Sequence, residues 1–224
     1  MKLFLPFVII AAVALLTAGI AARAYHEKMR PAPALMPGVE ASPQPANTLE
    51  GAAYARGPRD APVTLEIYGD FQCPPCAVVS KGIDAIQRQY EGRVRVVFRE
   101  FPLEIHKHAK EAALAAEAAA IQGKFWEMHD ELYENQLSWA EAPKVNSLFE
   151  SYAEAIGLDV ARFHADSMAP DVRRRVLADI NAGDRRAVDR TPTVFVNGVR
   201  LGNSFSKDQL EKAIVAALPL KKNS

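Results

Sequence analysis

Cysteine occurs at only two positions in this 224-residue chain, Cys73 and Cys76, and Pro74 and Pro75 lie between them. Two thiols three positions apart can form a disulfide and reopen it by exchange with another thiol. A cystine that closes so short a loop adds little stability, because the chain entropy that a disulfide removes from the unfolded state grows with loop length. The spacing therefore favours a redox-active pair over a structural staple.

The composition around this pair is that of a globular chain, with 49% hydrophobic and 24% charged residues. Lys and Arg together number 27, as do Asp and Glu. This balance of charge gives no basis for binding nucleic acid or an acidic substrate. About 175 residues remain after the N-terminal segments described next, a length that fits one domain.

Near the start of the chain, Lys2 precedes a long apolar stretch. Residues 3–22 carry no charge, and Ala22-Arg23-Ala24 has the small-x-small form of a signal-peptide cleavage site. A stretch of this length also just spans a bilayer core. Residues 1–24 are therefore either a cleaved signal peptide or an uncleaved anchor, associated with the inner membrane through residues 3–22. Both alternatives export the domain to a periplasmic or other extracytoplasmic space, where oxidising conditions suit a working dithiol.

A proline-rich segment separates this leader from the rest of the chain. Residues 25–50 hold five of the fifteen prolines, among Ala, Gly, Ser and Gln, and show no apolar periodicity. Such a composition is typical of an extended linker, and a pro-segment would look the same. The folded domain is expected over residues 51–220.

The cysteines are expected at the junction of a strand and a helix. Residues 63–68 alternate like a β-strand, and Gly69-Asp70 ends that strand just before the cysteines. Apolar residues then recur with a helical period as far as Tyr90, which predicts an amphipathic helix that starts at the motif. A second strand is expected over residues 93–98. Together these elements predict a βαβ unit with a right-handed parallel crossover.

A block of helices is expected next. Residues 108–183 read as successive helices, and strand character returns only at residues 193–196. Asn197-Gly198 is a strong hairpin turn, and Ser206 with Gln209 forms a capping box for a last helix. The sequence therefore predicts an α/β fold in which a helical insertion, at about residues 104–186, separates a βαβ half from a ββα half.

Four blocks in collinear order, from about Ala61 to Ala217, resemble the DsbA-like thiol:disulfide oxidoreductases of the thioredoxin superfamily. The blocks are Asp70-Phe71-Gln72-Cys73-Pro74-Pro75-Cys76, Arg99-Glu100-Phe101-Pro102-Leu103 with His106, Gln122-Gly123-Lys124-Phe125-Trp126, and Arg190-Thr191-Pro192-Thr193-Val194-Phe195-Val196-Asn197-Gly198. The resemblance implies a thioredoxin fold interrupted by a helical insertion, and no cofactor. It also implies a cis Thr191–Pro192 bond against the cysteine pair.

These positions assign a role to each residue of the expected site. Cys73 lies where the helix begins, and unpaired N–H groups and the helix dipole favour its thiolate, so we expect it to be the nucleophile. Cys76, one turn later, is expected to be buried and to resolve the mixed disulfide. Thr191 and Pro192 would bind extended or unfolded protein substrates that carry thiols or disulfides. An unidentified redox partner would then reset the pair.

The direction of exchange depends on the two central prolines. Related oxidases often have a histidine between the cysteines, whereas Pro74 and Pro75 remove two N–H donors and add no charge. Asp70 and Glu66 also oppose ionisation of Cys73, and Arg190 would partly reverse this. The resemblance favours formation of disulfides in exported proteins, with disulfide reduction or isomerisation as the alternative. A soft-metal carrier that binds copper through the dithiolate is an alternative of another class.

Further polar residues carry weaker expectations. Family members often have a carboxylate where this chain has Ile67, and alternation along the strand turns the adjacent Glu66 to the other side. His106 is expected to cap or orient the first inserted helix, and no metal site is expected. A solvated helix face is expected from five arginines, Arg173, Arg174, Arg175, Arg185 and Arg186.

Overall fold

The computed structural model describes residues 54–202 and 206–219 of the chain. The expected signal peptide or membrane anchor at residues 1–24 and the linker at residues 25–50 lie outside these residues. Among the described residues, no helix is both long enough and apolar enough to cross a membrane.

Five strands form one mixed sheet in the order β1-β3-β2-β4-β5. The strands are β1 (Tyr54–Arg56), β2 (Val63–Gly69), β3 (Val94–Glu100), β4 (Thr193–Val196) and β5 (Val199–Arg200). β2 and β3 are parallel, with Ile67 opposite Phe98 and Gly69 opposite Glu100. The other three pairs of neighbouring strands are antiparallel. The parallel β2–β3 pair and the antiparallel β4–β5 hairpin match the two halves predicted from the sequence.

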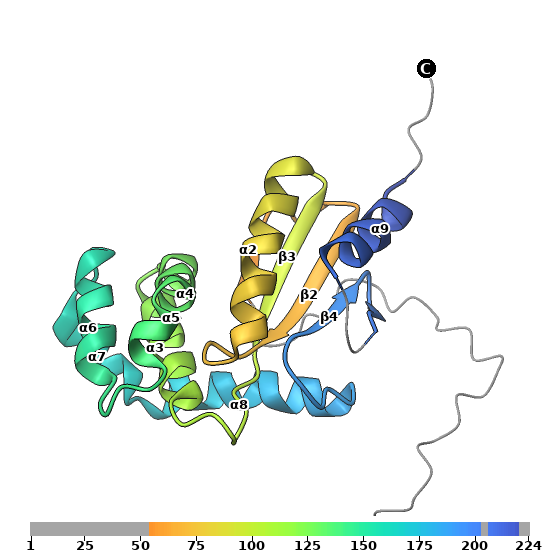
Figure 1. Cartoon of the computed structure of the whole chain (residues 1–224). Helices are drawn as coiled ribbons and strands as arrows, with labels where there is room; N and C mark the ends of the chain where they lie inside the picture. Colours follow the sequence, from red (N-terminus) through yellow and green to blue (C-terminus); the bar gives the residue numbers. More distant parts are fainter. Residues whose placement is uncertain (1–53, 203–205, 220–224) are drawn as a thin grey trace, which may run out of the picture. The chain divides into compact units, whose positions relative to one another are not determined.

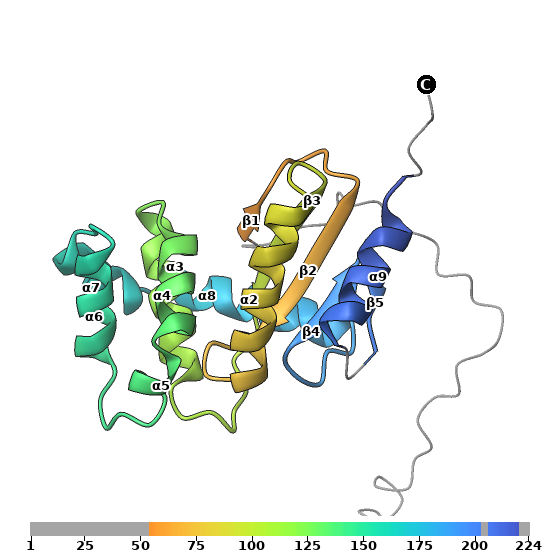
Figure 2. The same cartoon turned by 45° about the horizontal axis from the view of Figure 1, so that its top comes forward.

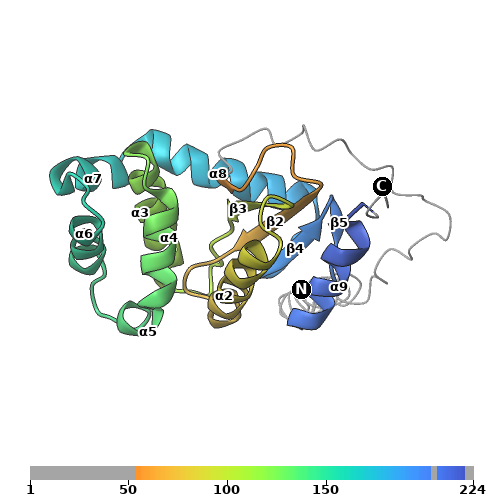
Figure 3. The ribbon, with the colours of Figure 1, turned by 90° about the horizontal axis from the view of Figure 1, so that it is seen from above.

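Helices cover both faces of this sheet (Figure 3). α2 (Pro74–Gln89) and α9 (Lys207–Ala217) lie on one face, and α8 (Pro170–Arg185) lies on the other. α2 buries Ile83 and Ile86, which belong to the apolar stripe expected from its sequence. α9 begins with the predicted capping box, in which Ser206 and Gln209 bond each other's backbone.

The inserted helices pack together beside the sheet (Figures 1 and 2). They are α3 (Ala109–Ile121), α4 (Phe125–Glu134), α5 (Gln136–Trp139), α6 (Asn146–Ala155) and α7 (Val160–Ser167). α3 contacts α4, α6, α7 and α8, and most of its alanines are buried. Small side chains on all sides of α3 allow these neighbours to approach closely. The predicted layout of two halves separated by helices is confirmed.

A buried ionic network joins the sheet to α8. The Arg99 guanidinium lies 3.0 Å from Glu66 and 2.7 Å from Asp179, and all three side chains are buried. Arg186 of the segment after α8 also pairs with Glu66, and its guanidinium lies 3.6 Å from the centre of the Phe195 ring.

The expectation of five solvated arginines on this helix was therefore wrong in part. Arg186 binds Glu66, and Arg175 binds the buried carboxylate of Glu117 at 2.9 Å. Both are only half-exposed, whereas Arg173, Arg174 and Arg185 are exposed. A buried carboxylate needs a cation or hydrogen-bond donors, and sequence periodicity does not reveal that need.

Candidate active site

The cysteine motif forms the first turn of α2. Cys73 is the N-cap residue, with φ −75° and ψ 116°, and Pro74 and Pro75 occupy the first helical positions. Proline suits these positions because their N–H groups would have no partner within the helix. The Cys76 N–H donates to the Cys73 carbonyl at 3.0 Å, and the Cys73 N–H donates to the Asp70 carbonyl at 3.1 Å. The helix therefore begins at the motif, as predicted.

The segment before β4 lies against the first cysteine. The Cys73 thiol donates to the Thr191 carbonyl at 3.4 Å, and the Thr191–Pro192 peptide bond is cis. Pro192 lines a small cavity together with Cys76. The structure thus brings Cys73 and Cys76 together with Thr191 and Pro192, which lie more than a hundred positions later in the chain. Pro74 and Pro75 are exposed at the start of α2.

The two thiols, both free in the structure, differ in acidity although both are buried. The hydrogen bond from the Cys76 thiol lowers the pKa of Cys73 to about 6, against the opposing effect of burial; Thr191 and the Cys76 backbone N–H lower it further. Burial raises the pKa of Cys76 well above its ordinary value, and the interaction with Cys73 raises it further. A thiolate on Cys73 therefore coexists with a protonated Cys76 near neutral pH.

Asp70 is the charged group that precedes the motif in the chain. It is buried, and its carboxylate accepts from the Gln72 N–H at 2.7 Å, the Leu103 N–H at 2.8 Å and His106 Nδ1 at 2.6 Å. The negative charge of Asp70 raises the pKa of Cys73, although it is the smallest of the contributions.

One expectation about the neighbouring basic residues needs correction. His106 does not cap the first inserted helix: the N-cap of α3 is His108, and the His106 ring binds Asp70 instead. A buried carboxylate 36 positions away in sequence outcompetes the helix end for this imidazole. Arg190 pairs with Asp189 at 3.2 Å, and its expected effect on the Cys73 thiolate stays a prediction.

The insertion contributes contacts that the sequence did not indicate. The Gln136 side-chain amide on α5 donates to the Phe71 carbonyl at 2.6 Å and to the Cys73 carbonyl at 3.1 Å. The Gln72 side-chain amide also donates to the Ala140 carbonyl, just after α5, at 2.7 Å. Gln72 directly precedes the motif and could have been suspected from its position, but α5 has only four residues and no period that would single out Gln136.

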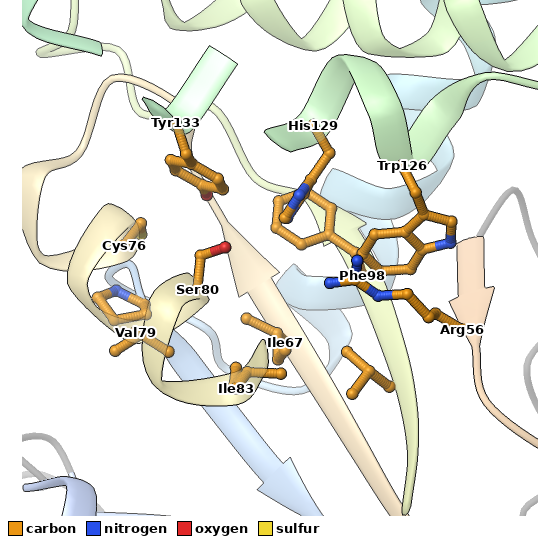
Figure 4. Close-up of a pocket in the computed structure, with 12 residues that line it drawn as sticks. Arg56, Ile67, Cys76, Val79, Ser80, Ile83, Phe98, Trp126, His129 and Tyr133 are labelled. Atoms are coloured by element: carbon orange, nitrogen blue, oxygen red, sulfur yellow. The ribbon is translucent and has the colours of Figure 1, made fainter. Parts of the chain in front are cut away.

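A cavity lies behind the second cysteine, between α2, β2 and α4 (Figure 4). Ile67 contributes to its wall, as expected for the position at which family members often carry a carboxylate. Glu66 points to the opposite face of the sheet, where it binds Arg99 and Arg186, and this confirms the predicted alternation. The polar side chains around the cavity include those of Ser80, His129 and Tyr133. Over residues 54–202 and 206–219, no three His, Cys, Asp or Glu side chains cluster as a metal site would require.

Comparison with known proteins agrees with this geometry. A family model described as thioredoxin matches residues 50–216. A Na(+)/H(+) antiporter, NhaA 3 of Salinispora tropica, is 39% identical over 165 residues, which cover 73% of this chain and 24% of the antiporter. NhaA 1 of Mycolicibacterium gilvum is 39% identical over 168 residues, covering 73% of this chain and 26% of that protein. The chain thus spans about a quarter of the length of these curated relatives.

Solved structures show the same fold. BdbD from Bacillus subtilis is 25% identical with a TM-score of 0.66, over 73% of this chain and 91% of BdbD. A thioredoxin-like oxidoreductase from Silicibacter pomeroyi is 25% identical with a TM-score of 0.63, over 74% and 91% of the two chains. MdbA from Corynebacterium diphtheriae, a thiol-disulfide oxidoreductase, shares the fold at 21% identity and a TM-score of 0.59, over 70% and 85%. The chain therefore belongs to the thioredoxin family and has a thioredoxin fold with a helical insertion, similar in structure to these thiol-disulfide oxidoreductases.

Proposed function

We propose that Cys73 and Cys76 form the redox pair of this oxidoreductase, with Cys73 as the nucleophile. The observation that carries the proposal is the asymmetry of the two thiols. The pKa of Cys73 is lowered to about 6 at the start of α2, while that of Cys76 is raised in the interior. The group that attacks or leaves must be a thiolate, and Cys73 supplies it near neutral pH.

The exchange follows from this asymmetry. A substrate thiolate attacks Cys73 Sγ of the oxidised protein, the Cys73–Cys76 bond breaks, and Cys76 leaves as a thiolate that takes up a proton. A second substrate thiolate then attacks the substrate sulfur of the mixed disulfide and displaces Cys73 as a stabilised thiolate. The substrate loses two electrons and gains a disulfide, and the protein pair is reduced.

We propose disulfide formation as the working direction. A stabilised Cys73 thiolate makes the reduced protein more stable, and a more stable reduced form makes the disulfide a stronger oxidant. Reduction or isomerisation is the second candidate. It is favoured by the two prolines, which add no charge to the motif, and by Thr191 as the residue before the cis proline.

Substrate binding is assigned to Thr191 and Pro192, with Pro74 and Pro75 shaping the motif beside them. The Thr191 carbonyl lies 3.4 Å from Cys73 Sγ, so a substrate cysteine bonded to Cys73 would lie next to the main chain of this segment. Recognition through main-chain groups would accept many extended or unfolded proteins. The apolar residues 3–22 support export, to the periplasm or an equivalent compartment, where a separate redox partner would reset the pair.

The equilibrium reduction potential in glutathione buffers tests the direction. We expect a value between −270 mV, that of thioredoxin, and −120 mV, that of a strong oxidant, because the pKa of Cys73, about 6, is lowered less than in a strong oxidase. A shift of about 30 mV corresponds to a tenfold change in the two-electron equilibrium. A value near −270 mV would replace oxidation with reduction.

Trapping with Cys76→Ala tests the exchange itself. This variant should retain protein substrates as mixed disulfides on Cys73, because the resolving thiol is absent. A Cys73→Ser, Cys76→Ala double variant is the matched control and should retain none. Recovery of no mixed disulfide from exported proteins would contradict the proposed function.

A further inference from the structure

The proposed function creates a proton-transfer problem at Cys76. This thiol must lose a proton each time it attacks a mixed disulfide on Cys73, and gain one each time it leaves. Its exposure is 3%, and its pKa lies well above the ordinary value, so bulk water cannot readily take the proton. No carboxylate lines the cavity behind it, because Ile67 occupies the wall at that point.

Two helices instead present polar pairs to this cavity. Cys76 and Ser80 are four positions apart on α2, and His129 and Tyr133 are four positions apart on α4, so each pair shares one helix face. All four residues line the cavity, and Figure 4 shows the Cys76 and Ser80 side chains on α2 across from the Tyr133 and His129 rings on α4. The cavity volume is about 10 Å³, which is room for about one water molecule, and such a water needs two to four polar partners.

His129 is held in a form suited to accept a proton. Its Nδ1 lies 2.8 Å from the Asp130 carboxylate, to which it donates as the neutral ring, so the lone pair is on Nε2. The rings of Phe98, Trp126 and Tyr133 surround the imidazole at centroid distances of 4.9 to 5.0 Å. Burial lowers the pKa of His129, which keeps the ring neutral at pH 7.

We propose that His129, oriented by Asp130, exchanges the Cys76 proton through a single water held in this cavity. In the resolving step the Cys76 thiol gives its proton to the water, which passes a proton to His129 Nε2. The Cys76 thiolate attacks Cys73 Sγ, the Cys73–substrate bond breaks, and the substrate leaves as a thiolate. Asp130 is a positioning residue, and its partly exposed carboxylate stabilises the transient imidazolium and places it near solvent.

The charges that face His129 come from three elements. Asp130 on α4 and Asp84 on α2 favour the protonated ring, whereas Arg56 on β1 disfavours it. Arg56 pairs with both carboxylates, at 2.5 Å for Asp84 and 3.5 Å for Asp130. Cys76 and Tyr133 are the other titratable groups on the cavity wall. The rate of resolution should therefore fall as the pH drops through the lowered pKa of His129.

A two-phase reaction with an aromatic disulfide reagent separates the two cysteines. The reduced protein attacks 5,5′-dithiobis(2-nitrobenzoate) with Cys73 and releases one coloured thiolate, in a phase that depends on reagent concentration. Cys76 then attacks the resulting mixed disulfide and releases a second coloured thiolate, in a phase whose rate does not depend on reagent concentration. General bases contribute about 10²- to 10⁴-fold, so His129→Gln should slow the second phase at least about tenfold at pH 7. Imidazole added to this variant should restore part of the lost rate.

Matched variants keep the test decisive. Asp130→Asn leaves the buried ring in place and should slow the second phase in the same direction as His129→Gln. His164→Gln removes an exposed imidazole with the same kind of pairing, Nδ1 to Glu150 at 2.6 Å, and should leave both phases unchanged. A second phase of wild-type rate and wild-type pH profile in His129→Gln and Asp130→Asn would overturn the proposal. Absence of the first phase in the wild-type protein would instead overturn the proposed function.

Discussion

The two faces of the central sheet bury different kinds of side chain. The face toward α2 and α4 carries Ile67 and Phe98 and is filled by apolar and aromatic side chains, with the two cysteines at its edge. The face toward α8 carries Glu66 and Arg99, which form a buried ionic network with Asp179. The residues alternate along the same two strands, since Glu66 and Ile67 are neighbours on β2.

Because of this difference, the reactive cysteines lie on one face of the sheet and the ion pairs that attach α8 lie on the other. Near the cysteines burial raises the pKa of Cys76, and the hydrogen bond between the thiols lowers the pKa of Cys73. On the other face the buried carboxylates of Glu66 and Asp179 both pair with Arg99, and this network joins α8 to the sheet. Substitutions on the cysteine face should therefore change rates, and those on the α8 face should change stability.

The largest expected effect is on the cysteine face. Cys73→Ser replaces a thiol whose pKa is about 6 with a hydroxyl that does not ionise near neutral pH. Exchange with a protein disulfide such as insulin should fall at least about a thousandfold. The reduced protein should lose only the small stabilisation that the lowered pKa of Cys73 provides near neutral pH, and a much larger loss of stability would show that the two faces are not separable.

Removal of one partner from the ionic network should lower stability and leave the reaction of Cys73 unchanged. Asp179→Ala leaves Arg99 buried with only Glu66 as a partner, and breaking a buried pair costs about 3–5 kcal/mol in the free energy of unfolding measured in urea. Asp171→Ala is the control on the same helix, because its pair with Arg174 is exposed, and it should change stability by less than about 1 kcal/mol. The reaction of Cys73 with the aromatic disulfide should keep its wild-type rate in folded Asp179→Ala.

A pH-dependent effect is expected where α3 meets α8. Burial raises the pKa of Glu117 from 4.5 to about 7, although Tyr54 and Arg175 oppose the shift. Between these values the folded protein binds more protons than the unfolded chain, so stability is greatest at low pH and falls as the pH rises through 7. The free energy of unfolding should drop by about 2 kcal/mol between pH 5 and pH 7 from this group alone. In Glu117→Gln, urea unfolding at the two pH values should lack this drop, and a drop of wild-type size would contradict the assignment.

The smallest expected effect concerns Asp70, the buried carboxylate that precedes the motif. Asp70→Asn keeps an acceptor for the Gln72 N–H and removes the negative charge that raises the pKa of Cys73. The pKa of Cys73 should therefore fall, by less than about one unit, and the couple should become slightly more oxidising. Titration of the Cys73 thiolate absorbance checks this, and a raised pKa would show that Asp70 acts mainly through its hydrogen bonds.

Elements with a clear period could be predicted from the sequence. The apolar stripe of α2, the alternation of β2 and β3 and the capping box of α9 each arise within one stretch of chain. β1 and α5 could not be predicted, because three and four residues show no period. β1 is held by pairing with β3 and by the stack of Tyr54 on Phe125, at 3.8 Å between ring centroids.

The same distinction applies to the site. The cysteine pair follows from the rarity and spacing of its residues, and Thr191 and Pro192 follow from the resemblance. Gln136 and His129 reach the site only because the insertion folds back on the sheet, and nothing adjacent to them in sequence indicates it. His106 was assigned to the wrong partner because Asp70 is distant in sequence.

The bonds from Gln136 to the carbonyls of Phe71 and Cys73 limit how this site can be transplanted. A protein engineer who moves only Cys73-Pro74-Pro75-Cys76 into another scaffold leaves behind the amide that holds the preceding turn. Either the graft includes α5, or the host must supply a donor of equal reach. The smallest module that could carry this site to another protein is therefore discontinuous in sequence, with the motif in one segment and its supporting helix in another.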